Sequence, residues 1–314
     1  MKKITYTNLL NRTLELLKKS GSLKAYNYIT ENAYKVKGNK AQIFNFRYAL
    51  ASASGLEREA LNIMREAIIK KGFWYSYDYL TKDEDLKPLY KYNEFKDMIN
   101  LCKIREEKAK KSLESKIKIV NNKGNKERKP LFISLHGNQE NIELTEDYWK
   151  SVTDKFTLAL PQSSQIEFSD AYNWEDLCKG TDEVKRHFKN IIKNYNIDLD
   201  NIIIGGFSAG CRVALNLLLN DNIKAKGFIF VSPWLPELNE WKSLIKKLKE
   251  KDIKGFIICG DKDEDCYECS KDFVSLLEKE NIKHEFKIIK DLDHDYPNDF
   301  EDILNGAIKF IINK

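Results

Sequence analysis

The chain has 314 residues, of which 42% are hydrophobic and 11% aromatic. That is enough apolar surface for one large or two ordinary domains, and it excludes global disorder. The formal net charge is +5, from 53 basic and 48 acidic residues that are interleaved along the chain. We therefore expect a solvated surface of mixed charge and no nucleic-acid partner.

Targeting and membrane signals are weak. Two lysines follow Met1, but the apolar core of a signal peptide does not. No run of about 18 apolar residues occurs, so we expect no transmembrane helix and no stable membrane insertion. Six cysteines in a chain of this length do not form the dense pattern of a disulfide framework. We expect a cytoplasmic protein with reduced thiols.

Residues 1–113 have apolar side chains at spacings of three and four, the pattern of amphipathic helices. A shift of 34 residues aligns Gly21 with Gly55 and Ala33 with Ala67. This period resembles that of tetratricopeptide helix pairs, and two such pairs are too few to stand alone. We expect a helical, tetratricopeptide-repeat-like domain that binds a protein partner or a second copy. A generic helical bundle is the alternative.

Residues 114–314 alternate between strand and helix patterns after a basic turn at 121–129. This alternation predicts an α/β domain with a mostly parallel sheet covered on both faces, and functional groups at the carboxyl ends of the strands. The expected strands are Ser115–Val120, Leu131–Leu135, Phe156–Leu160, Asn201–Gly205, Gly227–Val231, Gly255–Cys259 and Glu285–Ile289. The expected helices are Glu146–Thr153, Asp182–Tyr195, Ala209–Leu219, Trp241–Lys249, Cys269–Lys279 and Asp299–Ile312.

The most informative segment lies between the strand at 201–205 and the apolar helix that follows it. It reads Gly206-Phe207-Ser208-Ala209-Gly210. A serine with glycines two positions to either side, between a strand and a helix, is the pattern of a nucleophile elbow. The glycines let the strand and helix approach each other, and the serine occupies strained backbone. Ser208 is the expected nucleophile, and an ordinary strand-to-helix turn is the alternative.

A serine nucleophile needs a histidine base, and an elbow of this kind precedes its acid and then its histidine in the chain. The chain has four histidines. His294 follows the last expected strand, where the base belongs. His187 is expected on the surface of a charged helix, His284 begins a strand, and His136 is expected to be structural.

The acid should follow the strand at 255–259. The loop there reads Gly260-Asp261-Lys262-Asp263-Glu264-Asp265. Asp263 has the expected spacing from the glycine, with Asp261 and Asp265 as alternatives on the same loop.

An oxyanion hole needs two backbone N–H groups. Ala209, directly after the nucleophile, should supply one of them. The second should come from the loop that begins with His136 and Gly137, from either Asn138 or Gln139. The aromatic side chains expected around the substrate are Phe207, Trp174, Trp234 and Tyr296.

These motifs stand in the order and rough spacing of the α/β-hydrolase superfamily. From about Ile117 onward the chain resembles its phospholipase/carboxylesterase and dienelactone-hydrolase-like esterases, although the loop after His136 lacks the family's extra glycines. The resemblance implies a doubly wound sheet and a serine hydrolase without a cofactor. It implies that a small-molecule carboxylic ester or thioester acylates Ser208, that His294 moves the proton and that Asp263 orients His294.

Two other functions are compatible with parts of this pattern. A peptidase of the prolyl-oligopeptidase type has the same triad order, but its extra domain is usually a propeller of strands. A non-catalytic adaptor would use the helical repeats for binding. Cys266 and Cys269 form a single C-x-x-C, a weak signal for zinc or redox chemistry, and we expect no metal.

Overall fold

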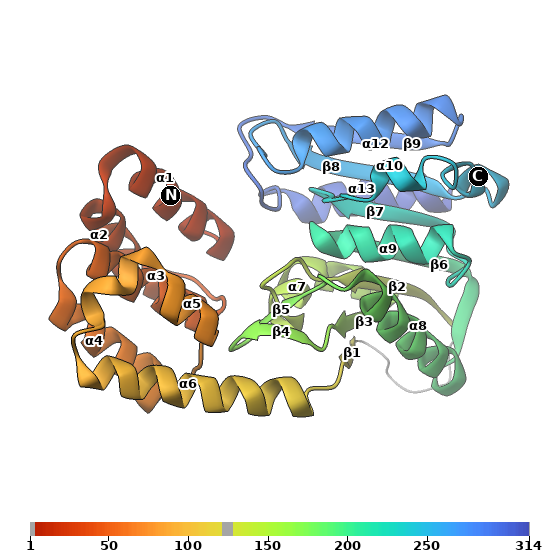
Figure 1. Cartoon of the computed structure of the whole chain (residues 1–314). Helices are drawn as coiled ribbons and strands as arrows, with labels where there is room; N and C mark the ends of the chain where they lie inside the picture. The colour runs from red at the N-terminus through yellow and green to blue at the C-terminus, as the bar shows by residue number, and fades with distance from the viewer. Residues whose placement is uncertain (1–3, 121–127, 314) are drawn as a thin grey trace. The chain divides into compact units, whose positions relative to one another are not determined.

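The computed structural model describes residues 4–120 and 128–313 (Figure 1). The chain divides into two compact units, one of Met1–Leu113 with Ile166–Ala171 and one of Glu114–Gln165 with Tyr172–Lys314. Most of the basic turn expected at 121–129 lies outside the described residues.

The first unit is helical, and each helix from α1 to α4 packs against the next along the chain. Local signals set several ends: the Thr5 side chain accepts the Asn8 N–H at the start of α1, and Gly21, with φ of 85°, ends it. The helices are α1 (Tyr6–Ser20), α2 (Ser22–Asn32), α3 (Lys40–Ala53), α4 (Glu57–Met64), α5 (Tyr77–Lys82) and α6 (Asn93–Ser112), with short helical turns η1 (Ala33–Lys35), η2 (Arg65–Lys70) and η3 (Glu84–Leu89).

A short segment distant in sequence belongs to this helical unit. In residues 166–171, Ser169 exchanges two hydrogen bonds with Trp74: its N–H donates to the Trp74 carbonyl at 3.1 Å, and its hydroxyl accepts the Trp74 N–H at 2.8 Å. The Asn39 side chain donates to the Ser169 carbonyl at 3.1 Å. The segment lies in a hairpin of β4 (Gln165–Phe168) and β5 (Ala171–Asn173), which the sequence pattern did not predict.

The second unit is built on a seven-stranded sheet, within the described residues, of order β1-β3-β2-β6-β7-β8-β9. Only β1 pairs antiparallel. The predicted α/β class and mostly parallel sheet are confirmed. The strands are β1 (Lys116–Val120), β2 (Lys129–Leu135), β3 (Thr157–Gln162), β6 (Ile197–Phe207), β7 (Gly227–Val231), β8 (Lys254–Gly260) and β9 (His284–Ile289).

Helices cover both faces of this sheet (Figure 1). The core on one face is formed with α8 (Leu177–Asn194), α9 (Ala209–Leu219), α10 (Leu238–Trp241), α11 (Lys246–Glu250) and α12 (Tyr267–Lys279). The other core is formed with α7 (Ile142–Trp149), η4 (Lys150–Asp154) and α13 (Phe300–Ile312). Because both faces are covered, the central strands read as continuous apolar runs.

Two sequence expectations about this unit are wrong. The helix expected over 241–249 is interrupted, and α10 and α11 are separated by a turn at 242–245. His187 is buried, because α8 turns the stripe of Val184, His187 and Ile191 towards the sheet. Its Nε2 lies 3.0 Å from the Ser115 hydroxyl.

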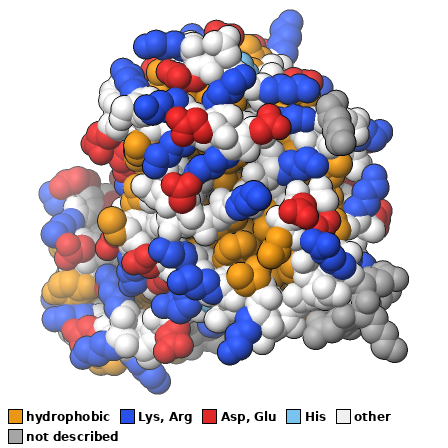
Figure 2. All heavy atoms as spheres, turned by 90° about the vertical axis from the view of Figure 1, so that its right-hand side faces the viewer, with side chains coloured by type: hydrophobic (Ala, Val, Ile, Leu, Met, Phe, Trp, Pro, Cys, Tyr) orange, Lys and Arg blue, Asp and Glu red, His pale blue; other side chains and the backbone are white. Residues whose placement is uncertain are grey.

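The exposed surface carries both signs of charge. On the face shown in Figure 2, basic and acidic side chains are interspersed. Among the described helices, none is both long and apolar enough to cross a bilayer.

Candidate active site

Ser208 lies at the junction of β6 and α9 with φ of 50° and ψ of −120°, a conformation that L-residues rarely adopt. Its N–H continues the sheet by donating to the Val231 carbonyl at 3.0 Å. Its own carbonyl accepts the N–H groups of Cys211 at 3.0 Å and Trp234 at 3.3 Å. The segments after β6 and β7 therefore hold the turn in place, and the side chain remains half-exposed.

Glycine is required at the two positions that flank Ser208, because a larger side chain would collide with neighbouring backbone atoms. A Cβ on Gly206 would lie 2.8 Å from the Gly210 carbonyl carbon, and a Cβ on Gly210 would lie 2.5 Å from the carbonyl oxygens of both Leu135 and His136. Helix α9 thus packs backbone to backbone against the end of β2. This is the physical reason for the glycine spacing around Ser208.

Replacing Gly210 by alanine should lower the free energy of unfolding by about 2–3 kcal/mol, because backbone atoms must move to admit the methyl group. Gly306→Ala is the matched control: Gly306 also lies in a helix, but a Cβ there meets nothing within 4 Å. We expect it to be neutral or to stabilise by up to about 1 kcal/mol. Urea denaturation measures both changes, and equal effects would contradict the contact argument.

The structure brings His294 and Asp263 together. The Nδ1–H of His294 donates to Asp263 Oδ2 at 2.9 Å. The ring of His294 packs against Phe207, the residue before Ser208, with centroids 4.8 Å apart. Asp263 Oδ1 accepts the Cys266 N–H at 3.0 Å, and the Cys259 thiol approaches Oδ2 at 3.7 Å. The acid is therefore held on several sides.

The other two aspartates of the acid loop have different positions. Asp261 accepts the Asp291 N–H at 2.7 Å, which ties the acid loop to the loop that carries His294. The same two loops touch at Gly260, where an added Cβ would lie 1.9 Å from the Leu292 carbonyl oxygen. Asp265 is exposed. Of the three aspartates, Asp263 is the one hydrogen-bonded to His294.

The electrostatics of the pair favour an ionised acid. Burial raises the pKa of Asp263, but the hydrogen bond and charge of His294, together with Ser232 and the Cys266 N–H, outweigh it, so the pKa is lowered. Burial likewise disfavours the charged form of His294. Its hydrogen bond to Asp263 and the charges of Asp263, Asp265 and Glu140 outweigh that effect and raise the pKa of His294 above its ordinary value of 6.5.

The loop after β2 carries both candidates for the second oxyanion donor. The Gln139 N–H already donates to the Asn173 side chain at 2.9 Å. Asn138 is exposed, and its side chain accepts the Trp174 N–H at 2.9 Å. At the elbow, Ala209 is the first residue of α9, so its N–H has no acceptor within the helix.

Glu140 lies in the same loop and was not predicted from the sequence to have a role. It is buried, and its carboxylate accepts the Gly137 N–H at 2.7 Å. Burial raises its pKa to about 7. The sequence does contain a local signal for this contact. Glu140 stands three residues after Gly137, a spacing at which a side chain can cap a turn by accepting a backbone N–H.

His136 is structural, as predicted. The Ser163 N–H donates to its Nε2 at 3.2 Å, so the ring proton is on Nδ1, which lies 2.7 Å from the Gly137 carbonyl. Burial lowers the pKa of His136 to about 4. Its ring stacks on Trp174 with centroids 4.6 Å apart.

The four aromatic residues expected around the substrate have different environments. Trp174 is fully buried against His136, and its indole N–H donates to the His136 carbonyl at 2.8 Å. Phe207 and Tyr296 are also buried and stack on each other with centroids 4.7 Å apart. Trp234 alone has substantial exposure, at 37%. The first three therefore pack behind the site in this structure and present almost no surface.

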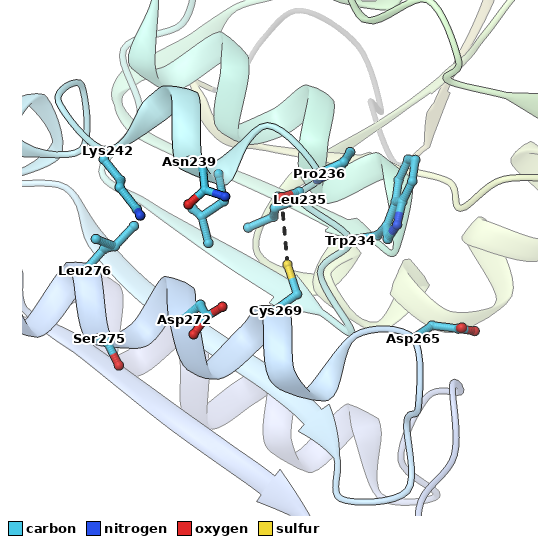
Figure 3. A pocket seen from close by; sticks show the side chains of 11 residues that line it. Trp234, Leu235, Pro236, Asn239, Lys242, Asp265, Cys269, Asp272, Ser275 and Leu276 are labelled. Atoms are coloured by element: carbon cyan, nitrogen blue, oxygen red, sulfur yellow. Dashed lines mark hydrogen bonds between the residues drawn. The ribbon is translucent and has the colours of Figure 1, made fainter.

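A cavity of about 500 Å³ begins at Trp234 and Asp265 and extends between the segment after β7 and α12. Figure 3 shows Asn239 and Lys242 on one side of it and Asp272 on the other. Its lining also includes apolar side chains, such as Leu235, and is therefore of mixed polarity. Its lining does not include Ser208, Asp263 or His294, and its link to the elbow is Trp234, whose N–H donates to the Ser208 carbonyl at 3.3 Å.

Family models match both parts of the chain. The model described as "A/B hydrolase-like, N-terminal domain" matches residues 5–110, and the model described as "Phospholipase/Carboxylesterase" matches residues 118–312. The chain belongs to the phospholipase/carboxylesterase family. Membership of the phospholipase/carboxylesterase family identifies an esterase-type hydrolase.

Solved structures agree with this assignment. A protein from Bacillus cereus ATCC 10987 is 53% identical to the chain, over 98% of this chain and 99% of that one, with a TM-score of 0.58. The carboxylesterase of Bacillus cereus is 19% identical, over 64% and 97%, with a TM-score of 0.50. A carboxylesterase from Mesorhizobium loti is 17% identical, over 62% and 94%, also at 0.50. At these identities the two carboxylesterases show the phospholipase/carboxylesterase fold alone. The comparison with curated proteins gave no match.

Proposed function

We propose that the chain is a serine esterase that cleaves a carboxylic ester or thioester through an acyl-enzyme on Ser208. The observation that carries this proposal is the 2.9 Å hydrogen bond between His294 Nδ1 and Asp263 beside the strained turn that presents Ser208. The bond leaves the lone pair of His294 Nε2 available for the serine proton.

In the proposed reaction, Ser208 Oγ attacks the substrate carbonyl while His294 Nε2 accepts its proton. His294 then donates that proton to the leaving alcohol or thiol, and a water molecule, activated by the same nitrogen, releases the acid product. The negative charge on the tetrahedral oxygen is stabilised by the N–H of Ala209 at the start of α9, and the N–H of Asn138 is the second donor. We prefer Asn138 over Gln139 because the Gln139 N–H already donates to Asn173.

The cavity beside Trp234 supports a substrate with both apolar and polar groups. Its lining combines leucines with Asn239, Lys242 and Asp272. A long acyl chain would leave these polar groups without partners, at a cost in binding. A small-molecule ester with a polar substituent fits this lining better.

The helical unit is proposed to dock a protein partner or a second copy, in the manner of a tetratricopeptide-like array. Its support is a set of exposed large apolar side chains, namely Leu14, Leu23, Tyr34, Leu56, Ile69 and Ile104. A cytoplasmic location is supported by six free cysteines.

The test is covalent labelling of the full chain by a fluorophosphonate, followed by peptide mass spectrometry, with turnover of a short-chain aryl ester measured in parallel. We expect one adduct, on Ser208, and loss of turnover in proportion to labelling. Turnover that survives complete labelling, or an adduct on another serine, would contradict the proposal.

A further inference from the structure

We infer that Asp263, Cys266 and His294 form a binding site for Zn²⁺ or a similarly soft divalent cation, and that the bound cation inhibits the esterase. Only the inhibition rests on the proposed function, because the binding is a property of the three side chains. The cation here is an inhibitor and not a cofactor.

The three side chains already converge. One carboxylate oxygen of Asp263, Sγ of Cys266 and a ring nitrogen of His294 all lie within 4.8 Å of one another. Tetrahedral zinc with bonds of 2.0–2.3 Å places its ligand atoms about 3.3–3.8 Å apart. The ligand atoms therefore need to move by about 1 Å, which side-chain rotation can supply.

The local fold accounts for this convergence. Asp263 accepts the Cys266 N–H at 3.0 Å, and the Tyr267 N–H donates to the Asp263 carbonyl at 3.0 Å as α12 begins. This tight turn places the Cys266 thiol beside the Asp263 carboxylate. His294 comes from the loop that follows β9. Cys269 is separate, since its Sγ contacts the Leu235 carbonyl at 3.9 Å (Figure 3). The two cysteines of the C-x-x-C therefore do not share a metal site. The proposed ligands that join Cys266 are Asp263 and His294.

The donor set and its charge select the ion. Sulfur, imidazole nitrogen and one carboxylate oxygen suit Zn²⁺ or Cd²⁺, whereas Mg²⁺ and Ca²⁺ prefer oxygen ligands alone. A carboxylate and a thiolate balance the two charges of the ion, which matters because Asp263 and Cys266 are 1% and 0% exposed. The His294 side chain is 25% exposed, so the ion has an entry on that side.

Two buried hydroxyls, those of Ser232 and Ser270, lie near this site. Burial raises the pKa of Cys259 to about 12, and both hydroxyls act against that rise, so they lie close to the Cys259 thiol. That thiol in turn approaches the Asp263 carboxylate. The polar groups behind the acid are therefore this thiol and the two hydroxyls.

Binding would stop the proposed reaction in two ways. His294 Nδ1, which faces Asp263, gives its lone pair to the metal, so its proton moves to Nε2 and the ring stays neutral. Nε2 then has no lone pair for the proton of Ser208. Asp263 loses its hydrogen bond to His294 by ligating the metal itself. At His294 the Nδ1–H bond breaks and an Nε2–H bond forms, so the ring keeps one proton. The thiol of Cys266 releases its proton to solvent as its sulfur binds, and this is the one proton lost.

The experiment uses the full chain in metal-free buffer. Zn²⁺ should inhibit ester turnover at micromolar concentration, a chelator should restore it, and millimolar Mg²⁺ should have no effect. Cys266→Ala should raise the inhibitory concentration of Zn²⁺ by more than about tenfold, since even second-sphere changes cost 10–100-fold. Cys269→Ala, from the same C-x-x-C, should not change it. Each variant is normalised to its own metal-free rate, and Cys266→Ser replaces the alanine variant if that misfolds.

A binding readout separates this inference from the proposed function. Cd²⁺ should produce the ultraviolet thiolate charge-transfer absorption in the wild type and in Ser208→Ala, and not in Cys266→Ala. If this Cd²⁺ absorption is seen but the wild type has no esterase activity, the metal site is supported and the proposed esterase function is wrong. Zn²⁺ inhibition that is equally strong in Cys266→Ala, or a Cd²⁺ signal that survives the loss of Cys266, would overturn the site.

Discussion

Ser208→Ala is expected to lower kcat/KM for a short-chain aryl ester by about 10⁴-fold or more, since loss of a nucleophilic serine removes the covalent route and leaves only oxyanion stabilisation and binding. The fold should persist, because alanine retains the Cβ that Ser208 places in strained backbone at φ of 50°. The measurement is steady-state kinetics together with thermal unfolding of both proteins.

Ser112→Ala is the matched control, since its hydroxyl is exposed and bonded to the Lys108 carbonyl at the end of α6. It should retain wild-type kinetics. If Ser208→Ala remains folded and keeps more than about a tenth of the wild-type kcat/KM, the acyl-enzyme route through Ser208 is wrong, because removal of a triad member costs far more than that.

Asp263→Asn is the second large effect, with an expected loss in kcat of about 10³–10⁴-fold. An asparagine amide donates to Nδ1 of His294 and so favours the tautomer with its proton on Nε2, which cannot act as a base. Asp265→Asn, on the same loop but exposed, should change kcat by less than about tenfold. Equal losses in the two variants would show that the loop, and not the bond to His294, controls the rate.

The pH dependence gives an independent check on this pair. The base must be neutral, so kcat/KM rises with pH through the pKa of His294 in the free enzyme. That pKa is raised above 6.5, because the bond to Asp263 and the charges of Asp263, Asp265 and Glu140 outweigh burial. In Asp263→Asn the strongest of these contributions is lost while burial remains. The inflection of the residual activity should therefore move to lower pH, and an unmoved inflection would contradict the assignment.

Much of the site was predictable because its signals are local. Each candidate group follows a recognisable apolar strand: Ser208 after β6, Asp263 after β8 and His294 after β9. In a parallel sheet these carboxyl ends share one edge, so strand order alone predicts that the three meet. The glycines at 206 and 210 added a steric signal, because a Cβ at either position would lie only 2.8 or 2.5 Å from neighbouring backbone atoms.

The missed features depend on contacts between segments far apart in the chain. Trp174 was expected beside the substrate, yet it lies in the core because it stacks on His136, 38 residues away. His187 was expected at the surface, yet α8 turns it towards Ser115. A tryptophan in a loop has the same local pattern in either environment. His187, by contrast, has helical spacing from Val184 and Ile191, a signal for burial that the charged residues of the helix obscured.

The sequence alone was sufficient to predict the α/β class, the elbow at Ser208 and the histidine that follows the last strand. Strand, turn and helix propensities act over a few residues and can therefore be recognised locally. Spacing from Gly260 already favoured Asp263, but its hydrogen bond to His294, which Asp261 and Asp265 do not make, and the use of the Gln139 N–H by Asn173 required the folded chain. So did the convergence of Cys266 with His294 across 28 positions. In each case the deciding atoms come from loops that only the sheet brings to one edge, where a shift of one residue changes which side chain points inward.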